Sequence, residues 1–238
     1  MTISSKPIRL DRYLASVTDY SRNDAKKLIK LGDIYVDGRV VCDPKQLIAA
    51  DADVTLMGNP LRPLGPRYLM LNKPQGIICA ARDRRHSTVL DLLDEDNPER
   101  LHVVGRLDID TTGLVLLTDD GGWSHAITSP QRRCWKTYYV ETAEVIPERC
   151  IEHFARGVFL KDDKARTLPA ELTIIEDRSA RLKICEGRYH QVKRMFGAEG
   201  NAVTRLHREA IGYIHLDTDL AEGEYRALST DEVASVFE

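Results

Sequence analysis

The chain has 238 residues, of which 42% are apolar and 30% charged, and its formal net charge at pH 7 is -3. This length is enough for one sizeable core, or for a small domain beside a larger one. No run approaches the roughly 20 apolar residues that span a bilayer, and the first residues lack the apolar block of a secretion signal, so we expect a soluble, cytoplasmic protein without a membrane partner.

The first predicted elements are two short helices followed by a hairpin. Apolar residues recur at helical spacing from Leu10 to Val17, and a second helix is indicated by Ser21, a typical N-cap, and by Gly32 beyond its end. The dipeptide Asp37-Gly38 tolerates positive φ and separates two short β segments, which predicts a tight hairpin. Residues 54–56 are expected to add another strand.

A segment rich in Pro and Gly follows. Three prolines and two glycines between Gly58 and Pro66 oppose both helix and sheet. We therefore predict a linker at residues 59–66, a small domain at residues 1–58 and a larger domain at residues 67–238.

The first domain resembles the S4-like RNA-binding domain. The resemblance is carried by Arg9–Leu14, Ser21–Ile29 and Gly32–Gly38, and it implies binding to structured RNA. By residue type, the contacts to RNA phosphates would come from Arg9, Arg12, Arg22, Lys26, Lys27 and Lys30. The alternative interpretation is an amphipathic helix pair whose outer face is only solvated.

Short strands alternate with short helices in the second domain. The strand candidates are residues 68–71, 76–79, 114–117, 137–140, 172–175 and 180–184. The helix candidates are Val89–Leu93, Gly122–Ile127, Glu148–Arg156 and Gln191–Ala198. This is a mixed α+β pattern, and hairpin-length gaps between strands favour a mainly antiparallel sheet.

A polar stretch from Gly105 to Gly113 precedes an apolar strand and contains Asp108. We expect a loop here, and reactive side chains are often placed on such loops. A turn held by side-chain hydrogen bonds is the alternative, whereas the spacing of an EF-hand calcium loop is not met. The five cysteines are scattered and never spaced as Cys-x-x-Cys, so neither a disulfide framework nor a metal site is predicted.

Basic residues gather late in the chain. Residues 181–208 carry seven Lys or Arg against two Glu, a local charge of +5, and residues 209–238 carry one Arg against eight acidic residues, a local charge of -7. Such asymmetry permits a basic groove on an acidic protein, as phosphate backbones require. A solvated charged face explains the pattern equally well.

Four ordered segments resemble the pseudouridine synthase family. Asp108 lies in a stretch, 105–114, that resembles the family's central motif, and the other matching segments are residues 71–76, 136–138 and 186–196. With the S4-like start and the run 206–212, they point to the branch that modifies small-subunit ribosomal RNA. The resemblance implies an antiparallel-sheet catalytic domain that isomerises a uridine of 16S rRNA, at that branch's uridine-516 site, without a cofactor.

The resemblance also implies roles for individual residues. Asp108 would be the catalytic carboxylate, which adds to the base or the sugar or stabilises a cationic sugar. Tyr138 would stack on a uracil flipped out of the RNA, and its phenol is a candidate for removing the C5 proton. Lys193 would pair with Asp108 and keep it ionised, with Arg194 as the fallback partner. Several branches of the family have an arginine at this position. A lysine cannot make the bidentate pair of hydrogen bonds that an arginine makes with a carboxylate.

Other motif residues are expected to support the site. Lys73 and Pro74 would hold the active-site loop, and Arg106 would clamp a phosphate unless it pairs with Asp110 or Asp119. Further RNA contacts are assigned to Arg188, His190 and Arg194. On a helix His190, Lys193 and Arg194 would share one basic face. Trp135 departs from the family, in which a polar or acidic residue is commoner.

The expected partner is 16S rRNA or a small-subunit assembly intermediate, and the expected oligomeric state is a monomer. Three alternatives stay open at this point. One is a non-catalytic S4-like ribosome assembly factor, another is a pseudouridine synthase acting on 23S rRNA, and the third is a glycoside-cleaving enzyme using Asp108 and Asp110. The last would require opposed carboxylates, which successive loop residues rarely provide.

Overall fold

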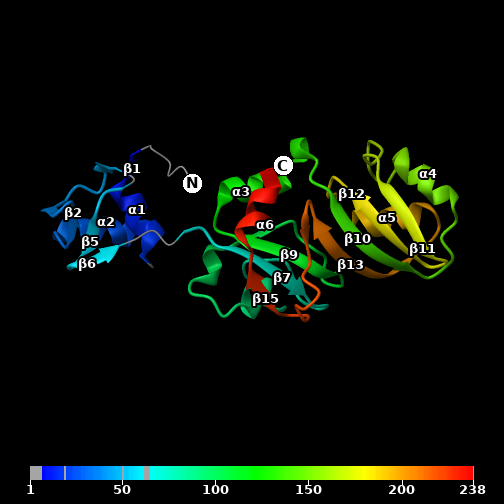
Figure 1. Ribbon diagram of the computed structural model, residues 1–238, viewed down its shortest axis with the longest axis horizontal. Coiled ribbons are helices and arrows are strands. Elements are labelled where there is room, and N and C mark those ends of the chain that lie inside the picture. The colour runs from blue at the N-terminus through cyan, green and yellow to red at the C-terminus, as the bar shows by residue number, and fades with distance from the viewer. Residues whose placement is uncertain (1–6, 19, 50, 62–64, 238) are drawn as a thin grey trace. The chain divides into compact units, whose positions relative to one another are not determined.

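The computed structural model describes residues 7–18, 20–49, 51–61 and 65–237. The chain divides into two compact units, residues 1–65 and 66–238, which are described separately (Figure 1). Within the described residues, no helix combines the length and the apolar character needed to cross a membrane.

The first unit packs two helices against small antiparallel sheets. Its elements are β1 (Ile8–Arg9), α1 (Leu10–Val17), α2 (Arg22–Leu31), β2 (Ile34–Val36), β3 (Arg39–Val40), β4 (Leu47–Ile48), β5 (Val54–Leu56) and β6 (Asn59–Leu61). The predicted cap is present, because the Ser21 hydroxyl accepts a hydrogen bond from the Asp24 amide at 3.2 Å. Asp37 and Gly38 both have positive φ, as a tight hairpin turn requires.

The start of the predicted linker was wrong. Residues 59–61 form β6, which pairs with β5 and places Pro60 opposite Thr55. β6 is the edge strand of the order β3-β2-β5-β6, where a proline without an N–H is tolerated. The Tyr13 hydroxyl donates to the Leu61 carbonyl at 2.8 Å and ties the strand to α1. Residues 62–64 of the predicted linker lie outside the described residues.

The second unit is built on one large sheet. Its strands are β7 (Tyr68–Lys73), β8 (His102–Val104), β9 (Thr112–Thr118), β10 (Lys136–Thr142), β11 (Glu171–Glu176), β12 (Ser179–Ile184), β13 (Val203–Ile211), β14 (Ile214–His215) and β15 (Tyr225–Ala227). The main path is β11-β12-β10-β13-β9-β7-β15, with β14 on β13 and β8 on β9. Only β13 and β9 pair in parallel, which confirms the predicted mainly antiparallel α+β fold.

Helices cover both faces of this sheet. They are α3 (Gly121–Thr128), α4 (Arg149–Ala155), α5 (Gln191–Ala198) and α6 (Thr230–Ala234), with short 3-10 turns at Val89–Leu92, Pro98–Arg100, Pro130–Arg132 and Ser235–Phe237. Figure 1 shows α3 and α6 together at the β7–β9 end, and α4 and α5 at the β10–β12 end. Strand β9 serves two cores, because Val115 packs into one cluster while Leu114 and Leu116 pack with Trp123 into another.

One glycine permits the parallel pairing in the middle of the sheet. Gly113 has a φ of +100°, and a Cβ added there would lie 2.4 Å from the Arg208 carbonyl oxygen. A side chain at this position would therefore force β9 away from β13. The glycine of the Asp108 motif is thus required by the fold itself.

Most predicted elements are confirmed, and α5 has the bounds expected from the sequence. Residues 76–79 are not a strand: Gly76 has a φ of +85°, and only an isolated bridge joins Ile78 to Thr88. Residues 89–92 form a 3-10 turn and not an α-helix. Strand β13 was not predicted, although it lies at the centre of the sheet.

Candidate active site

Asp108 lies in the loop between β8 and β9, and a buried lysine anchors this loop. The Lys73 ammonium, at the end of the neighbouring strand β7, donates to the carbonyls of Thr111 at 2.8 Å, Pro74 at 3.0 Å and Ile109 at 3.4 Å. Lys73 has no exposed surface, and this burial lowers the pKa of its ammonium. The buried cation is thus held by carbonyl dipoles of the loop that carries Asp108.

Two basic side chains approach the Asp108 carboxylate. The Lys193 Nζ atom lies 3.3 Å from Asp108 Oδ2, and the His190 Nε2 atom lies 3.5 Å from Asp108 Oδ1. Lys193 also contacts Asp110 Oδ1 at 2.5 Å. This hydrogen bond from Lys193 holds the pKa of Asp110 below its ordinary value, against the opposing effect of burial. One ammonium therefore serves two carboxylates.

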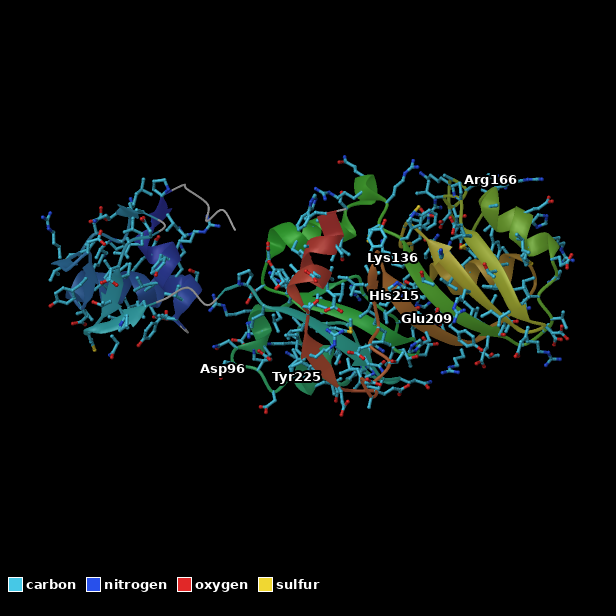
Figure 2. The ribbon with its side chains drawn as sticks, in the orientation of Figure 1. Asp96, Lys136, Arg166, Glu209, His215 and Tyr225 are labelled. Atoms are coloured by element: carbon cyan, nitrogen blue, oxygen red, sulfur yellow. The ribbon has the colours of Figure 1, made fainter. Side chains whose placement is uncertain are left out.

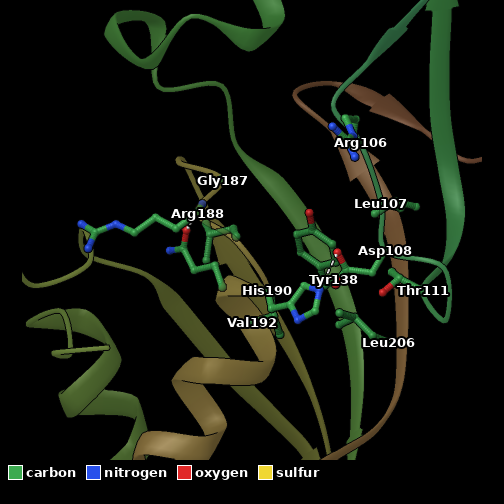
Figure 3. Close-up of a pocket in the computed structure, with 12 residues that line it drawn as sticks. Arg106, Leu107, Asp108, Thr111, Tyr138, Gly187, Arg188, His190, Val192 and Leu206 are labelled. Atoms are coloured by element: carbon green, nitrogen blue, oxygen red, sulfur yellow. Dashed lines mark hydrogen bonds and ion pairs between the residues drawn. The ribbon is translucent and has the colours of Figure 1, made fainter. Parts of the chain in front are cut away.

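His190 is not part of the helix, contrary to the predicted basic face. It has a φ of 48° and stands at the N-cap position of α5, with its ring stacked on Tyr189 at 3.8 Å between centroids. The left-handed backbone directs the imidazole toward Asp108 (Figure 3). Lys193 reaches the same carboxylate from the first turn of the helix.

Tyr138 on β10 faces Asp108 across the same pocket (Figure 3). Its hydroxyl is 3.5 Å from Nη1 of Arg208, which is only 1% exposed. The Arg208 guanidinium also donates to the carbonyls of Gly105 at 2.5 Å and Leu114 at 2.8 Å. The Arg208 guanidinium on β13 thus connects the strand that carries Tyr138 to both ends of the Asp108 loop.

The pocket combines polar groups with apolar walls. Asp108, Tyr138 and His190 face a lining that includes the apolar side chains of Leu107, Ile184, Val192 and Leu206. An adjoining depression of about 620 Å³ shares Asp108 and extends to Lys193. That volume falls within the range of roughly 300–1,000 Å³ that is usual for sites that bind small molecules. A single planar base with its sugar is therefore a suitable occupant.

Arg188 and Arg194 do not contact Asp108. Both donate to Asp163, with N–O distances of 2.9 Å and 2.6 Å, and also to backbone carbonyls of residues 161–166. Hydrogen bonds from Arg194 and Arg188 lower the pKa of Asp163. Figure 3 shows the Arg188 side chain extending away from the pocket. The fallback pairing of Arg194 with Asp108 was therefore wrong, and both guanidinium groups hold this loop against α5.

Arg106 lines both the pocket and the adjoining depression with an exposed side chain. Its two predicted ion-pair partners are engaged elsewhere, because Asp110 contacts Lys193 and Asp119 contacts Arg67 at 3.0 Å. Among the described residues, Arg106 makes no ion pair. Its guanidinium is therefore available to a phosphate near the pocket.

The predicted RNA-binding residues of the first unit fall into two groups. Arg9 and Arg22 contact the buried Asp11 at 2.7 Å and 3.5 Å, and Lys27 pairs with Asp24. Burial raises the pKa of Asp11, but the hydrogen bonds and charges of Arg9 and Arg22 together outweigh it, so the pKa is lowered. The second group consists of Arg12, Lys26 and Lys30, which make no ion pair within the part of the chain that the structure describes.

Sequence reasoning did not select Arg208 or Asp163. Arg208 was part of the motif-like run 206–212, but no pattern indicated that its guanidinium is buried. Asp163 lies in a loop that is distant in sequence from the two arginines it binds. The one available signal for Arg208 was a cation without an assigned role inside a motif-like run.

Comparison with known proteins shows similarity over both units. Residues 67–198 match the family described as RNA pseudouridylate synthase, and residues 8–54 match the S4 domain. Ribosomal small subunit pseudouridine synthase A of Escherichia coli (strain K12) is 52% identical over 230 residues, covering 96% of this chain and 100% of that protein. The proteins of the same name from Yersinia pestis and Vibrio cholerae are 51% and 46% identical, covering 96% and 97% of this chain and 98% and 100% of their own lengths.

Solved structures give the same result. A crystal structure of a pseudouridylate synthase is 43% identical to this chain, with a TM-score of 0.71, and the match covers 96% of this chain and 99% of that one. The similarity in sequence and in structure to these proteins therefore extends over nearly the whole chain.

Proposed function

Because the chain belongs to the RNA pseudouridylate synthase family, we propose that it isomerises one specific uridine of bacterial 16S ribosomal RNA to pseudouridine. The small-subunit substrate is supported by relatives that are 46–52% identical and are named ribosomal small subunit pseudouridine synthase A. The uridine-516 site is the target that this resemblance suggests. The names of these relatives favour 16S rRNA over the alternative of a 23S rRNA substrate.

The observation that carries the proposal is the position of Asp108. Its carboxylate lines both the pocket that contains Tyr138 and the adjoining depression of about 620 Å³, and it lies 3.3 Å from the Lys193 ammonium. An anionic carboxylate beside anionic RNA needs such a cation, because desolvation alone favours the neutral acid. The Lys193 ammonium and the His190 imidazole approach from two directions without covering the carboxylate, which keeps 30% of its side-chain surface exposed.

The reaction can be written with these residues and no co-reactant. The C1′–N1 bond of the uridine breaks, the uracil rotates in the pocket, and a bond forms between C1′ and C5. The proton on C5 then leaves while N1 gains one, so atoms and electrons balance within the nucleoside. We propose that Asp108 supplies the carboxylate needed at the reacting nucleoside.

Tyr138 and Arg106 have supporting roles in this proposal. Flipping the uridine out of folded RNA costs a few kcal/mol, and stacking on a planar side chain recovers part of it. The Tyr138 ring is fixed beside Asp108, with Arg208 at its hydroxyl, and is therefore ready to receive the base. The exposed Arg106 guanidinium is placed to pair with a flanking phosphate.

The test is the variant Asp108→Asn, expressed in a bacterial strain that lacks the gene for this chain. Carbodiimide-dependent primer extension then maps pseudouridine in 16S rRNA, because pseudouridine and uridine have the same mass. We expect the wild-type chain to restore one pseudouridine stop. The variant should reduce the modification rate by at least about 10³-fold, the scale seen when one member of a cooperating catalytic group is removed.

Asp110→Asn is the matched control, since Asp110 contacts the same lysine but does not line the pocket with Tyr138. It should lower the rate by less than about tenfold, the effect of a nearby exposed charge. RNA affinity, measured by filter binding, should be similar in both variants. Modification by Asp108→Asn at the wild-type rate would favour a non-catalytic RNA-binding assembly factor instead.

A further inference from the structure

A second cavity lies on the opposite face of the sheet from Asp108. It has a volume of about 700 Å³, and Thr137 and Lys183, which are cross-strand partners on β10 and β12, both line it. Their chain neighbours Tyr138 and Ile184 line the Asp108 pocket. Because successive side chains of a strand point to opposite faces, the two cavities lie back to back across β10 and β12.

The cavity forms where the helical cover of this face ends. One wall comes from α3 and the 3-10 turn at Ser235–Phe237, and another from the turn after β13 with Tyr213. The floor is the uncovered part of the sheet. Figure 2 labels Lys136 and His215 in this region, beside the C-terminal helix. We call this cavity the rear groove.

Aromatic side chains line the rear groove and are open to solvent. Trp135, Tyr213 and Phe237 are 38%, 69% and 60% exposed. The Arg132 guanidinium lies over the Phe237 ring, 5.9 Å from its centroid. Exposed rings together with cations are the elements from which stacking platforms for unpaired bases are built.

The charge of the groove is positive although the whole chain is acidic. Arg132, Arg133, Lys183 and His215 line it, against the single acidic side chain of Glu171. Glu171 contacts Lys183 at 3.5 Å, whereas neither Arg132 nor Arg133 makes an ion pair with any described residue. Two arginines are therefore free to bind phosphates.

We propose that the rear groove binds an unpaired RNA segment, with bases stacked on Trp135 and its neighbours and phosphates paired with Arg132 and Arg133. This inference rests on the proposed function in one respect, the source of the RNA. We take the bound segment to be the strand that flanks the target uridine. Trp135 lies directly before β10 and precedes Tyr138 by three residues, a distance of at most roughly 10 Å. RNA that leaves the Asp108 pocket around the start of β10 can therefore reach the groove within a few nucleotides.

The experiment uses the full-length chain and a fluorescein-labelled oligocytidine of ten nucleotides. This probe contains no uridine, so its binding does not depend on whether Asp108 is catalytic. Affinity and its dependence on salt are measured by fluorescence anisotropy, and stacking by quenching of tryptophan emission. The second tryptophan, Trp123, is only 1% exposed, and quenching therefore reports on Trp135.

We expect the wild-type chain to bind the probe with quenching. Trp135→Ala should weaken binding at least about fivefold, the lower end for one lost base–aromatic stack, and Trp135→Phe should recover affinity without the quenching. Removing both cations in R132A/R133A should reduce the slope of log K against log salt by about 1.4, since each single-strand phosphate contact contributes about 0.7.

The matched controls are Phe159→Ala and Arg149→Ala. Phe159 is 57% exposed and also lies under an arginine, Arg166, but lines neither cavity. Both controls should bind the probe like the wild type.

Unchanged affinity and salt slope in Trp135→Ala and R132A/R133A would overturn the proposal. A dimer seen by sedimentation velocity and lost only in Trp135→Ala, with RNA binding intact, would assign the groove to a protein partner and overturn it as well.

Activity separates this proposal from the proposed function. On a minimal stem-loop RNA that carries the target uridine, Trp135→Ala should retain the wild-type kcat. On 16S rRNA with its flanking strands, the same variant should lower kcat/KM by the factor seen with the probe. Inactive Asp108→Asn should still show full quenching, whereas an Asp108 variant that remains active would refute the catalytic proposal and leave the groove result unchanged.

Discussion

Arg208 illustrates how one buried side chain organises a site without facing it directly. Its guanidinium is almost fully buried, and no carboxylate among the described residues pairs with it. Its donors instead reach the Gly105 and Leu114 carbonyls and the Tyr138 hydroxyl. The residue thereby fixes the Asp108 loop relative to the strand that carries Tyr138. We regard Arg208 as a positioning residue.

Arg208→Met should therefore reduce both stability and turnover. It removes the guanidinium donor from the buried Leu114 carbonyl and from the partly buried Gly105 carbonyl, which we expect to cost about 2–6 kcal/mol of unfolding free energy at roughly 1–3 kcal/mol for each lost partner. kcat should fall more than RNA affinity, because the cations proposed to contact RNA are untouched. Urea unfolding and single-turnover pseudouridylation measure the two effects.

Two further variants separate positioning from simple destabilisation. Arg208→Lys keeps the charge but loses the planar fork, so it should recover part of the stability and little of kcat. Arg205→Met, on the same strand, removes an exposed arginine paired with Glu141 and should cost less than about 1 kcal/mol. Equal losses of kcat and RNA affinity in Arg208→Met would argue against a positioning role.

At the residue scale, the sequence could predict that Lys193 lies beside Asp108, because both lie in short motifs with fixed spacing. It could not show that Arg188 and Arg194 are held elsewhere. Their positions depend on Asp163, which binds both of them from a loop 25–31 residues away. Burial, as at Arg208, is likewise set by strands that meet only in three dimensions.

At the element scale, α6 depends on a single ionised side chain. Glu232 accepts two hydrogen bonds from Arg226, both at 2.9 Å, and also closes the capping box with Ser229. The Arg226 guanidinium, together with the Ser229 amide and against burial, lowers the pKa of Glu232 from 4.5 to about 2. Val233 of this helix accepts the indole N–H of Trp123, so the helix closes over the α3 core.

Glu232→Gln tests this contribution, because glutamine retains the capping geometry but not the charge. A depressed carboxylate pKa stabilises the folded state above the unfolded value of 4.5 and loses that effect as the pH falls toward 2. The variant should be less stable by about 1–2 kcal/mol at pH 7, after allowance for partial exposure. The difference should shrink between about pH 5 and pH 2.

Urea titrations followed by tryptophan fluorescence measure this difference at each pH. Glu222→Gln, an exposed glutamate in the preceding segment, serves as the control and should match the wild type throughout. A difference for Glu232→Gln that persists unchanged at pH 2 would mean that packing, and not charge, stabilises α6.

Elements were predictable where the apolar pattern determines them. The strands at β9, β10 and β12 read directly as apolar or alternating runs, whereas β13 alternates Arg, His and Glu with apolar residues on a half-buried face. Charged residues on that strand pair across the sheet, as Arg205 does with Glu141, so its sequence does not look like a central strand. Residues 76–79 show the opposite error. Their short apolar run predicted a strand, but the positive φ of Gly76 places them in a loop.

At the scale of the whole molecule, the net charge of -3 conceals separate basic surfaces. Many cations are neutralised locally, such as Arg226 by Glu232 and Arg9 by Asp11. The cations that remain unpaired are the ones able to release counterions from RNA. On the first unit these include Lys26 and Lys30, which are one turn apart on α2 and therefore share a face.

The double variant K26A/K30A should consequently weaken binding of 16S rRNA without altering chemistry. Each lost phosphate contact reduces the slope of log K against log salt by about 0.7–0.9, so the slope should fall by roughly 1.4–1.8. KM for 16S rRNA should rise while kcat stays constant, because the substituted residues belong to a different unit from Asp108. Lys45→Ala removes an exposed lysine of the same unit outside the helices and should change neither quantity. A fall in kcat with an unchanged salt slope would mean that α2 does not contact phosphate, and that the first unit affects the reaction through the catalytic unit itself.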